Sequence, residues 1–198
     1  CNKHGMAPNF EFGMVQTTLD GDLKWARMFP ANHNMNGIAL PGDASHPYAL
    51  TGAPDGSGYV IGGLAVVNGG GSYGKGRFAG YTQGRLVKVS PKGELVFDQR
   101  FQSRQSNTNV ECYGISSTGA GDGYILSCGT GVEPELYPNE PEQMRTWMAL
   151  VHRTDLDGKE LWQRNYSSNR GPPYRNDAGE HIITTKEGGY AVFLDSQS

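Results

Sequence analysis

A nine-residue pattern that occurs three times constrains this chain more than any other feature. The three copies read GDLKWARMF (21–29), GELVFDQRF (93–101) and GKELWQRNY (158–166). In each copy an aromatic residue follows the glycine by four positions, and a second aromatic residue follows four positions later. Repetition at long, similar intervals indicates a chain built from copies of one supersecondary unit.

The residues around each repeated glycine predict a β-hairpin. The segments GRLVKVS (84–90) and WMALVHRT (147–154), which precede the later two copies, are rich in apolar and β-branched residues, as strands are. The glycine supplies the positive φ that a tight hairpin turn needs. Because side chains at even spacing lie on one face of a strand, we expect the repeated aromatic residues to pack against a neighbouring sheet.

A second hairpin motif precedes each of the later two copies and occurs once more near the end of the sequence. It consists of a strand, a glycine-rich turn and a tyrosine that opens an apolar strand, with Tyr59, Tyr124 and Tyr190 as the tyrosines. The two hairpins together predict an all-β fold of four-stranded antiparallel units. Such units, repeated in series, are typical of β-propeller blades. Complete blades are expected at about 45–101 and 110–166, and half-blades at about 11–29 and 180–195.

These motifs resemble the GGY…LVK-D-G-LW repeats of secreted β-propeller proteins, which are akin to PQQ-like and WD40-like propellers. The resemblance covers nearly the whole chain and implies that residues 1–198 are a single propeller domain or part of one. It leaves the activity open, because propellers host many functions. Two blades and two half-blades are fewer than the usual four to eight. We therefore expect completion by other blades of the same parent chain or by a second copy.

Charge and hydropathy exclude two kinds of partner. The chain has 17 basic and 20 acidic residues, with no cluster of basic residues. Nucleic acid is therefore not an expected partner, because phosphate binding needs clustered lysine and arginine. No apolar run approaches the roughly 18 residues of a membrane-spanning helix, so no membrane span is expected.

Two of the three cysteines are predicted to form a disulfide within the hairpin 111–128. A five-residue loop at 118–122 pairs Ser117 with Gly123, and the same register places Cys112 opposite Cys128. Facing residues of an antiparallel pair lie within disulfide reach. The alternative is a shifted register with two free thiols.

The disulfide and a glycosylation motif together predict a secreted glycoprotein. Asn165-Tyr166-Ser167 matches the N-glycosylation motif, and disulfides form in oxidising compartments. Cys1 is left without a partner in the predicted fold, which suits a bond to a residue outside this sequence.

Four residues near the start of the innermost strands are candidates for a site at the centre of the ring. They are His46, Glu111, Glu180 and His181. Imidazole and carboxylate groups that converge in the channel could hold a polar ligand, calcium or another metal ion. The alternative is a solvated channel mouth lined by polar residues, and no organic cofactor is predicted.

The expected function is that of an extracellular, non-enzymatic binding or structural module with a glycan or protein ligand. The long segments 29–47, 68–83 and 129–146 interrupt the blade pattern and are candidate recognition loops. The alternative is a propeller enzyme with its site at the ring centre, either a quinoprotein-like oxidoreductase or a glycan-active hydrolase or lyase. Such an enzyme would place titratable groups with shifted pKa at the centre.

The two half-blades are expected to be covered by partner sheets, because an isolated two-stranded hairpin is marginally stable in water. We therefore expect burial of the apolar side chains that the half-blades share with the complete blades, namely Phe12, Val15, Trp25, Tyr190 and Val192.

Overall fold

The computed structural model describes residues 12–29, 45–66, 82–104, 109–131, 147–167 and 177–196. Within these ranges the chain forms twelve β-strands and no helix. The strands are β1 (Phe12–Thr17), β2 (Leu23–Phe29), β3 (Ser45–Gly52), β4 (Tyr59–Val66), β5 (Thr82–Val89), β6 (Leu95–Phe101), β7 (Asn109–Ser117), β8 (Gly123–Gly131), β9 (Trp147–Asp155), β10 (Glu160–Tyr166), β11 (Asp177–Thr184) and β12 (Tyr190–Ser196).

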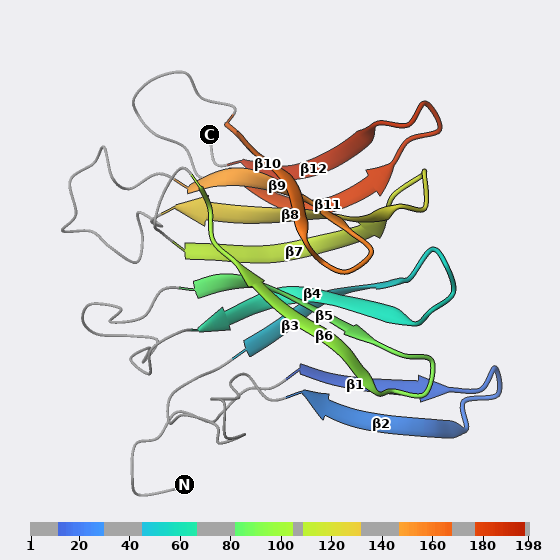
Figure 1. Ribbon diagram of the computed structural model, residues 1–198. Coiled ribbons are helices and arrows are strands. Elements are labelled where there is room, and N and C mark those ends of the chain that lie inside the picture. The colour runs from blue at the N-terminus through green and yellow to red at the C-terminus, as the bar shows by residue number, and fades with distance from the viewer. Residues whose placement is uncertain are drawn as a thin grey trace, which may run out of the picture.

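The strands form four antiparallel sheets that follow one another in chain order. Sheets β3-β4-β5-β6 and β7-β8-β9-β10 have four strands each, and sheets β1-β2 and β11-β12 have two. This confirms the predicted all-β class and the four-stranded units. Figure 1 shows the sheets as successive layers, with β1-β2 and β11-β12 at opposite ends of the stack. The two end sheets do not pair with each other, so the described strands do not close a ring.

The repeated glycine and aromatic residues form a contact that recurs between consecutive sheets. Gly93 and Gly158 have φ angles of 79° and 78°. A Cβ atom at Gly93 would lie 2.9 Å from the Trp25 ring, and one at Gly158 would lie 2.8 Å from the Phe97 ring. The aromatic residue of one sheet therefore rests on the hairpin turn of the next sheet. This confirms that the first aromatic residue of each copy packs against a neighbouring sheet. The prediction is wrong for Tyr166, the second aromatic residue of the third copy, which is 50% exposed.

The repeated tyrosines take part in the same contacts. The ring centroids of Trp25 and Tyr59 are 6.5 Å apart, and those of Trp162 and Tyr190 are 6.2 Å apart. Phe97 packs against the buried cluster that contains Tyr124. The first aromatic residue of one motif and the tyrosine of the other thus lie together between adjacent sheets. This shared contact is why the two sequence motifs recur together.

Three apolar clusters fill the three spaces between sheets. The first contains Phe12, Phe29 and Val87, the second centres on Leu86, Leu126 and Leu150, and the third contains Ile125, Val151 and Ile182. Burying an aliphatic or aromatic side chain of this size contributes about 1.5–3 kcal/mol. The sandwiched sheets are therefore largely apolar on both faces, although Arg85, Lys88 and Arg153 are also buried on their central strands.

The expected burial of the half-blades is only partly correct. Phe12 is buried and faces sheet β3-β4-β5-β6, and Trp25 and Val192 are partly buried. Val15 is 59% exposed, so the prediction for this residue is wrong. It lies on the face of β1 that no described sheet covers, and Phe193, 68% exposed, lies on β12 at the opposite end of the stack. An end sheet has one neighbour and buries one face.

The disulfide between Cys112 and Cys128 is present, but part of the predicted register is wrong. Ser117 pairs with Tyr124 and not with Gly123, because the hairpin turn is one residue longer than expected. A β-bulge at Tyr113 then shifts the register by one residue and brings Cys112 opposite Cys128. Two departures from regular pairing cancel, so the predicted disulfide forms.

Candidate functional site

The first strand of each of three consecutive sheets carries a β-bulge. The register shifts between Pro47 and Ala49 in β3, between Cys112 and Gly114 in β7, and between Gly179 and His181 in β11. The extra residues are Tyr48, Tyr113 and Glu180. A bulge turns a side chain away from its regular direction and is over-represented next to functional sites. The first strand of each of these three sheets therefore presents one such side chain. Bulges also recur on last strands, at Lys24 in β2, Val96 in β6 and Leu161 in β10.

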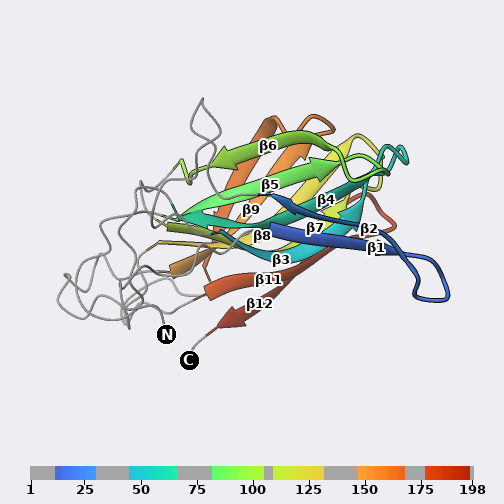
Figure 2. The same ribbon diagram turned by 90° about the horizontal axis from the view of Figure 1, so that it is seen from below.

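The three first strands pack against one another. Strand β7 contacts both β3 and β11, and Figure 2 shows β3 and β11 on the side of the molecule opposite β6. A Cβ atom at Gly114 would lie 2.9 Å from the Cα atom of His181 and 3.0 Å from the carbonyl oxygen of Glu180. The absence of a side chain at Gly114 lets β11 approach β7 at the two bulges.

Aromatic and carboxylate groups lie side by side across β3 and β7. The Tyr48 and Tyr113 ring centroids are 5.2 Å apart, and those of His46 and Tyr48 are 6.4 Å apart. The Tyr113 hydroxyl donates a hydrogen bond of 2.7 Å to Glu111 Oε2. Tyr48 is 47% exposed. We call the surface made by His46, Tyr48, Glu111, Tyr113, Glu180 and His181 the first-strand surface.

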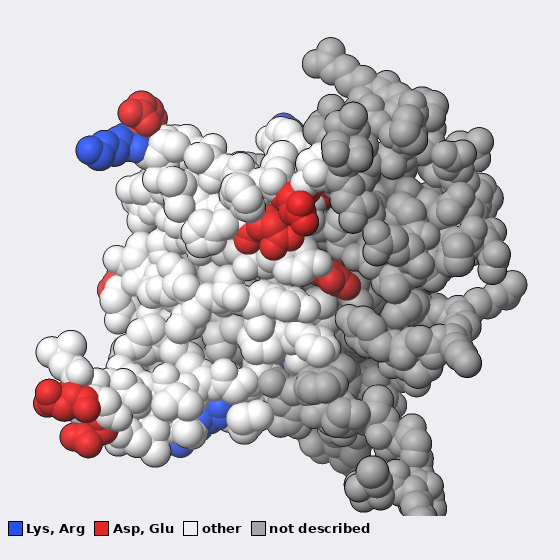
Figure 3. Space-filling model, turned by 180° about the vertical axis from the view of Figure 1, so that it is seen from behind, with Lys and Arg blue, Asp and Glu red and all other residues white. Residues whose placement is uncertain are grey.

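Acidic groups dominate the charge of this surface. Strands β3, β7 and β11 contain no lysine or arginine. Figure 3, which shows the molecule from behind, has acidic side chains gathered near its centre, and the other charged side chains of this view lie towards its edges. Burial, and then the neighbouring Asp195, raise the pKa of Glu180. Burial lowers the pKa of His46, so its imidazole is neutral at pH 7.

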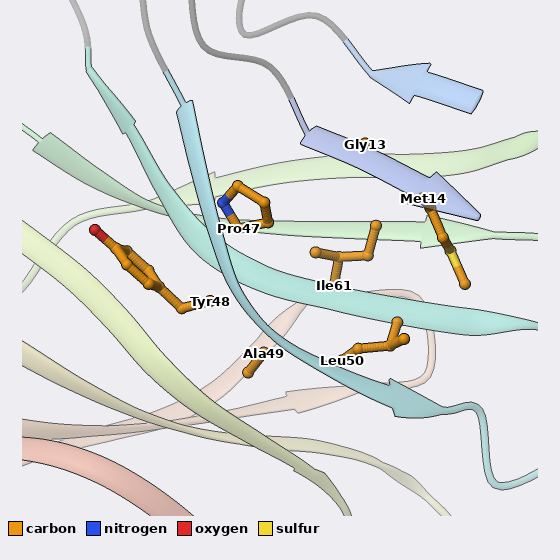
Figure 4. A pocket seen from close by; sticks show the side chains of 7 residues that line it. All are labelled: Gly13, Met14, Pro47, Tyr48, Ala49, Leu50 and Ile61. Carbon is orange, nitrogen blue, oxygen red and sulfur yellow. The ribbon is translucent and has the colours of Figure 1, made fainter. Parts of the chain in front are cut away.

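An apolar pocket adjoins the first-strand surface at Tyr48. It has a volume of about 220 Å³ and lies between β1 and β3. In Figure 4, Pro47, Ile61, Met14 and Leu50 lie around the pocket, while Tyr48 extends from β3 on the other side. The lining is completed by Gly13 and Ala49. Tyr48 thus connects an apolar recess to a tyrosine- and carboxylate-lined surface.

The four predicted site residues lie on these strands, but not as one cluster. His46 and Glu111 occupy equivalent positions two residues before the bulge residue, whereas Glu180 is itself the bulge residue of β11. His181 follows Glu180 and is exposed. Within the described ranges, no group of three or more His, Cys, Asp or Glu side chains could hold a metal ion. The four residues are not gathered into such a group, and a metal ion or a polar ligand at them stays a prediction.

Tyr48 and Tyr113 were missed as site residues because they read as ordinary strand residues. Aligning the units shows only that each follows its His46 or Glu111 counterpart by two positions. A bulge changes their direction, and sequence pattern alone does not locate bulges.

Three other predictions concern residues away from this surface. Asn165 is partly buried on β10, and its Nδ2 atom is buried without a hydrogen-bond partner in the described structure. Glycosylation there stays a prediction and requires this amide to turn outward. Cys1 and most of the three candidate recognition loops lie outside the described residues.

No protein-family model matches the chain, and no curated protein matches it. The described part of the chain contains no helix that could serve as a membrane span.

Proposed function

We propose that this chain is a non-enzymatic binding module, part of an extracellular β-propeller, and that its first-strand surface takes a protein ligand. The observation that carries the proposal is the β-bulge repeated at equivalent positions of β3, β7 and β11. It presents one re-aimed side chain from each of three adjacent sheets. A bulge also recurs at equivalent positions of β2, β6 and β10, so the tyrosine and carboxylate groups at the first-strand bulges are what favours a ligand at this surface.

The propeller part of the proposal is supported by the order of the sheets. Consecutive antiparallel sheets stack with their first strands in contact, as blades do around a ring. Sheet β11-β12 has the strands of the first half of a unit, and β1-β2 has those of the second half. Pairing of β12 with a β1-type strand, from a second copy or from further blades of the parent chain, would complete a blade. The Cys112–Cys128 disulfide supports an extracellular location.

The chemistry of the first-strand surface favours a polypeptide with a basic side chain beside an apolar one. Tyrosine faces attract lysine and arginine through cation–π interactions. Carboxylates on strands without basic residues complement the same charge. The pocket beside Tyr48 has room for one apolar side chain. An extended peptide crossing β3 and β7 would use both features.

Fluorescence anisotropy with two labelled peptides tests this proposal. One peptide alternates arginine and leucine, and the other alternates glutamate and leucine. We expect saturable binding of the arginine peptide alone, weakened about tenfold by Tyr48→Ala and by Glu111→Gln, about 1.4 kcal/mol each. Asp20→Asn, on the β1–β2 turn, is the matched control and should leave the affinity unchanged. Equal binding of both peptides, or no effect of Tyr48→Ala, would contradict the proposal.

One observation favours a second candidate, a glycan-active hydrolase. Glu180 and Asp195 interact electrostatically, and burial with this neighbour raises the pKa of Glu180. A carboxyl group with raised pKa beside a second carboxylate is the arrangement that glycosidases use for acid catalysis. Release of nitrophenol from a panel of nitrophenyl glycosides, lost in Glu180→Gln and retained in Glu111→Gln, would establish this candidate. No release from the wild-type chain would reject it for those substrates.

A further inference from the structure

A second recess lies between sheets β3-β4-β5-β6 and β7-β8-β9-β10, next to their outer strands. It has a volume of about 580 Å³, within the roughly 300–1,000 Å³ of small-molecule sites. Its lining comes from the end of β6 and from the β9–β10 hairpin. The lining residues are Gln99, Arg100, Phe101, Gln102, His152, Asp157, Gly158, Lys159 and Glu160.

His152 departs from the repeat at this place. Aligning Gly93 with Gly158 puts His152 at the position of Val87, a buried residue of the apolar cluster between the first two sheets. His152 is equally buried, and its ring stacks on Phe101 with centroids 3.7 Å apart and planes 2° apart. Stacking on Phe101 accounts for the ring of His152 but does not use its two nitrogen atoms.

The polar atoms of this recess leave two hydrogen-bonding groups without partners. His152 Nδ1 and Gln102 Oε1 are buried with no hydrogen bond in the described structure. Glu160 is 3.8 Å from His152 Nδ1, but its carboxylate is already bound by Arg104 and accepts a 2.6 Å hydrogen bond from Gln163 Nε2. An unpaired buried polar group costs about 1–3 kcal/mol. Both atoms belong to residues that line the recess, so a ligand bound there could complete their hydrogen bonds.

We propose that this recess binds a carbohydrate, as a ligand site separate from the first-strand surface. The ionisable lining is balanced, with Arg100 and Lys159 against Asp157 and Glu160, so an uncharged polar ligand fits better than an anion or a cation. Burial, and then Arg104, lower the pKa of His152 to about 3, so its imidazole is neutral at pH 7. Sugar hydroxyls both donate and accept hydrogen bonds, as an imidazole nitrogen and an amide oxygen require.

Long-range ¹H–¹⁵N NMR of the histidine rings tests the proposal directly. The whole chain is titrated separately with glucose, galactose, mannose and N-acetylglucosamine, and with phosphate and acetate as charged probes. We expect at least one sugar to shift the His152 ring signals saturably, with no saturable shift from phosphate or acetate. His152→Val, which restores the residue type of the equivalent position, and Gln102→Leu should each weaken that binding at least tenfold.

His181→Ala is the matched control, because His181 is exposed on β11, outside the lining of the recess. It should bind the same sugar with unchanged affinity, and a cooperative urea transition of His152→Val would show that the variant is folded. Three results would overturn the proposal: no saturable shift with any of the four sugars, a saturable shift with the charged probes only, or unchanged sugar binding by folded His152→Val. None of these results depends on peptide binding at the first-strand surface.

Discussion

Substitution of Gly158 by alanine should weaken the contact that joins consecutive sheets. Two separate costs are expected. The φ of 78° at Gly158 disfavours any residue with a Cβ atom by about 1–2 kcal/mol. The new methyl group would also lie 2.8 Å from the Phe97 ring, and overpacking of this kind costs about 1–3 kcal/mol.

Gly188→Ala separates these two costs. Gly188 has a φ of 85° at the turn between β11 and β12, and a Cβ atom there meets nothing within 4 Å. This control therefore includes the backbone cost alone. We expect Gly158→Ala to lower the free energy of unfolding by about 1–3 kcal/mol more than Gly188→Ala does. For a chain of this size the difference corresponds to an additional fall of about 2–12 °C in Tm.

Urea denaturation followed by tryptophan fluorescence, together with calorimetry, measures both variants. A further variant, Phe97→Ala in the Gly158→Ala background, removes the ring that the methyl group would strike. The two substitutions should couple by more than about 0.5 kcal/mol, because they share one contact. Equal losses for Gly158→Ala and Gly188→Ala, with no coupling to Phe97, would refute the idea that this glycine is required by the packing between sheets.

Two further predictions concern the disulfide and a buried histidine. Replacing Cys112 and Cys128 by alanine should lower stability by about 3 kcal/mol, as expected for a closed loop of this length, and peptide mapping without reductant should recover the linked peptides. Burial and Arg104 hold the pKa of His152 at about 3 in the folded chain, against 6.5 in the unfolded chain, and Glu160 also faces the ring. The unfolded chain therefore binds more protons between these values, so stability should fall as pH drops from about 6.5 towards 3. His152→Val should show a flatter fall in urea midpoints over this window, and parallel curves would contradict the prediction.

Much of the strand pattern and one covalent bond were predictable from the sequence. Glycine at 21, 93 and 158 marks a tight turn through its own backbone freedom, and the runs beside it alternate or are continuously apolar over a few residues. These are local properties, so the hairpins and four-stranded sheets agree with the expectation. The pairing of Cys112 with Cys128 was also predicted, although two cancelling irregularities produce it.

The candidate sites, in contrast, were decided by contacts between sheets. The bulges that turn Tyr48 and Tyr113 outward depend on how β3 and β7 pack against their neighbours, and no local pattern encodes that packing. The same reason applies to Val15 and His152, which occupy one repeat position. Val15 is exposed because no described sheet covers its face, whereas His152 is buried against Phe101 because a sheet does. A residue type sets what a side chain can do, and the neighbouring sheet decides whether it meets water, a ring or a ligand.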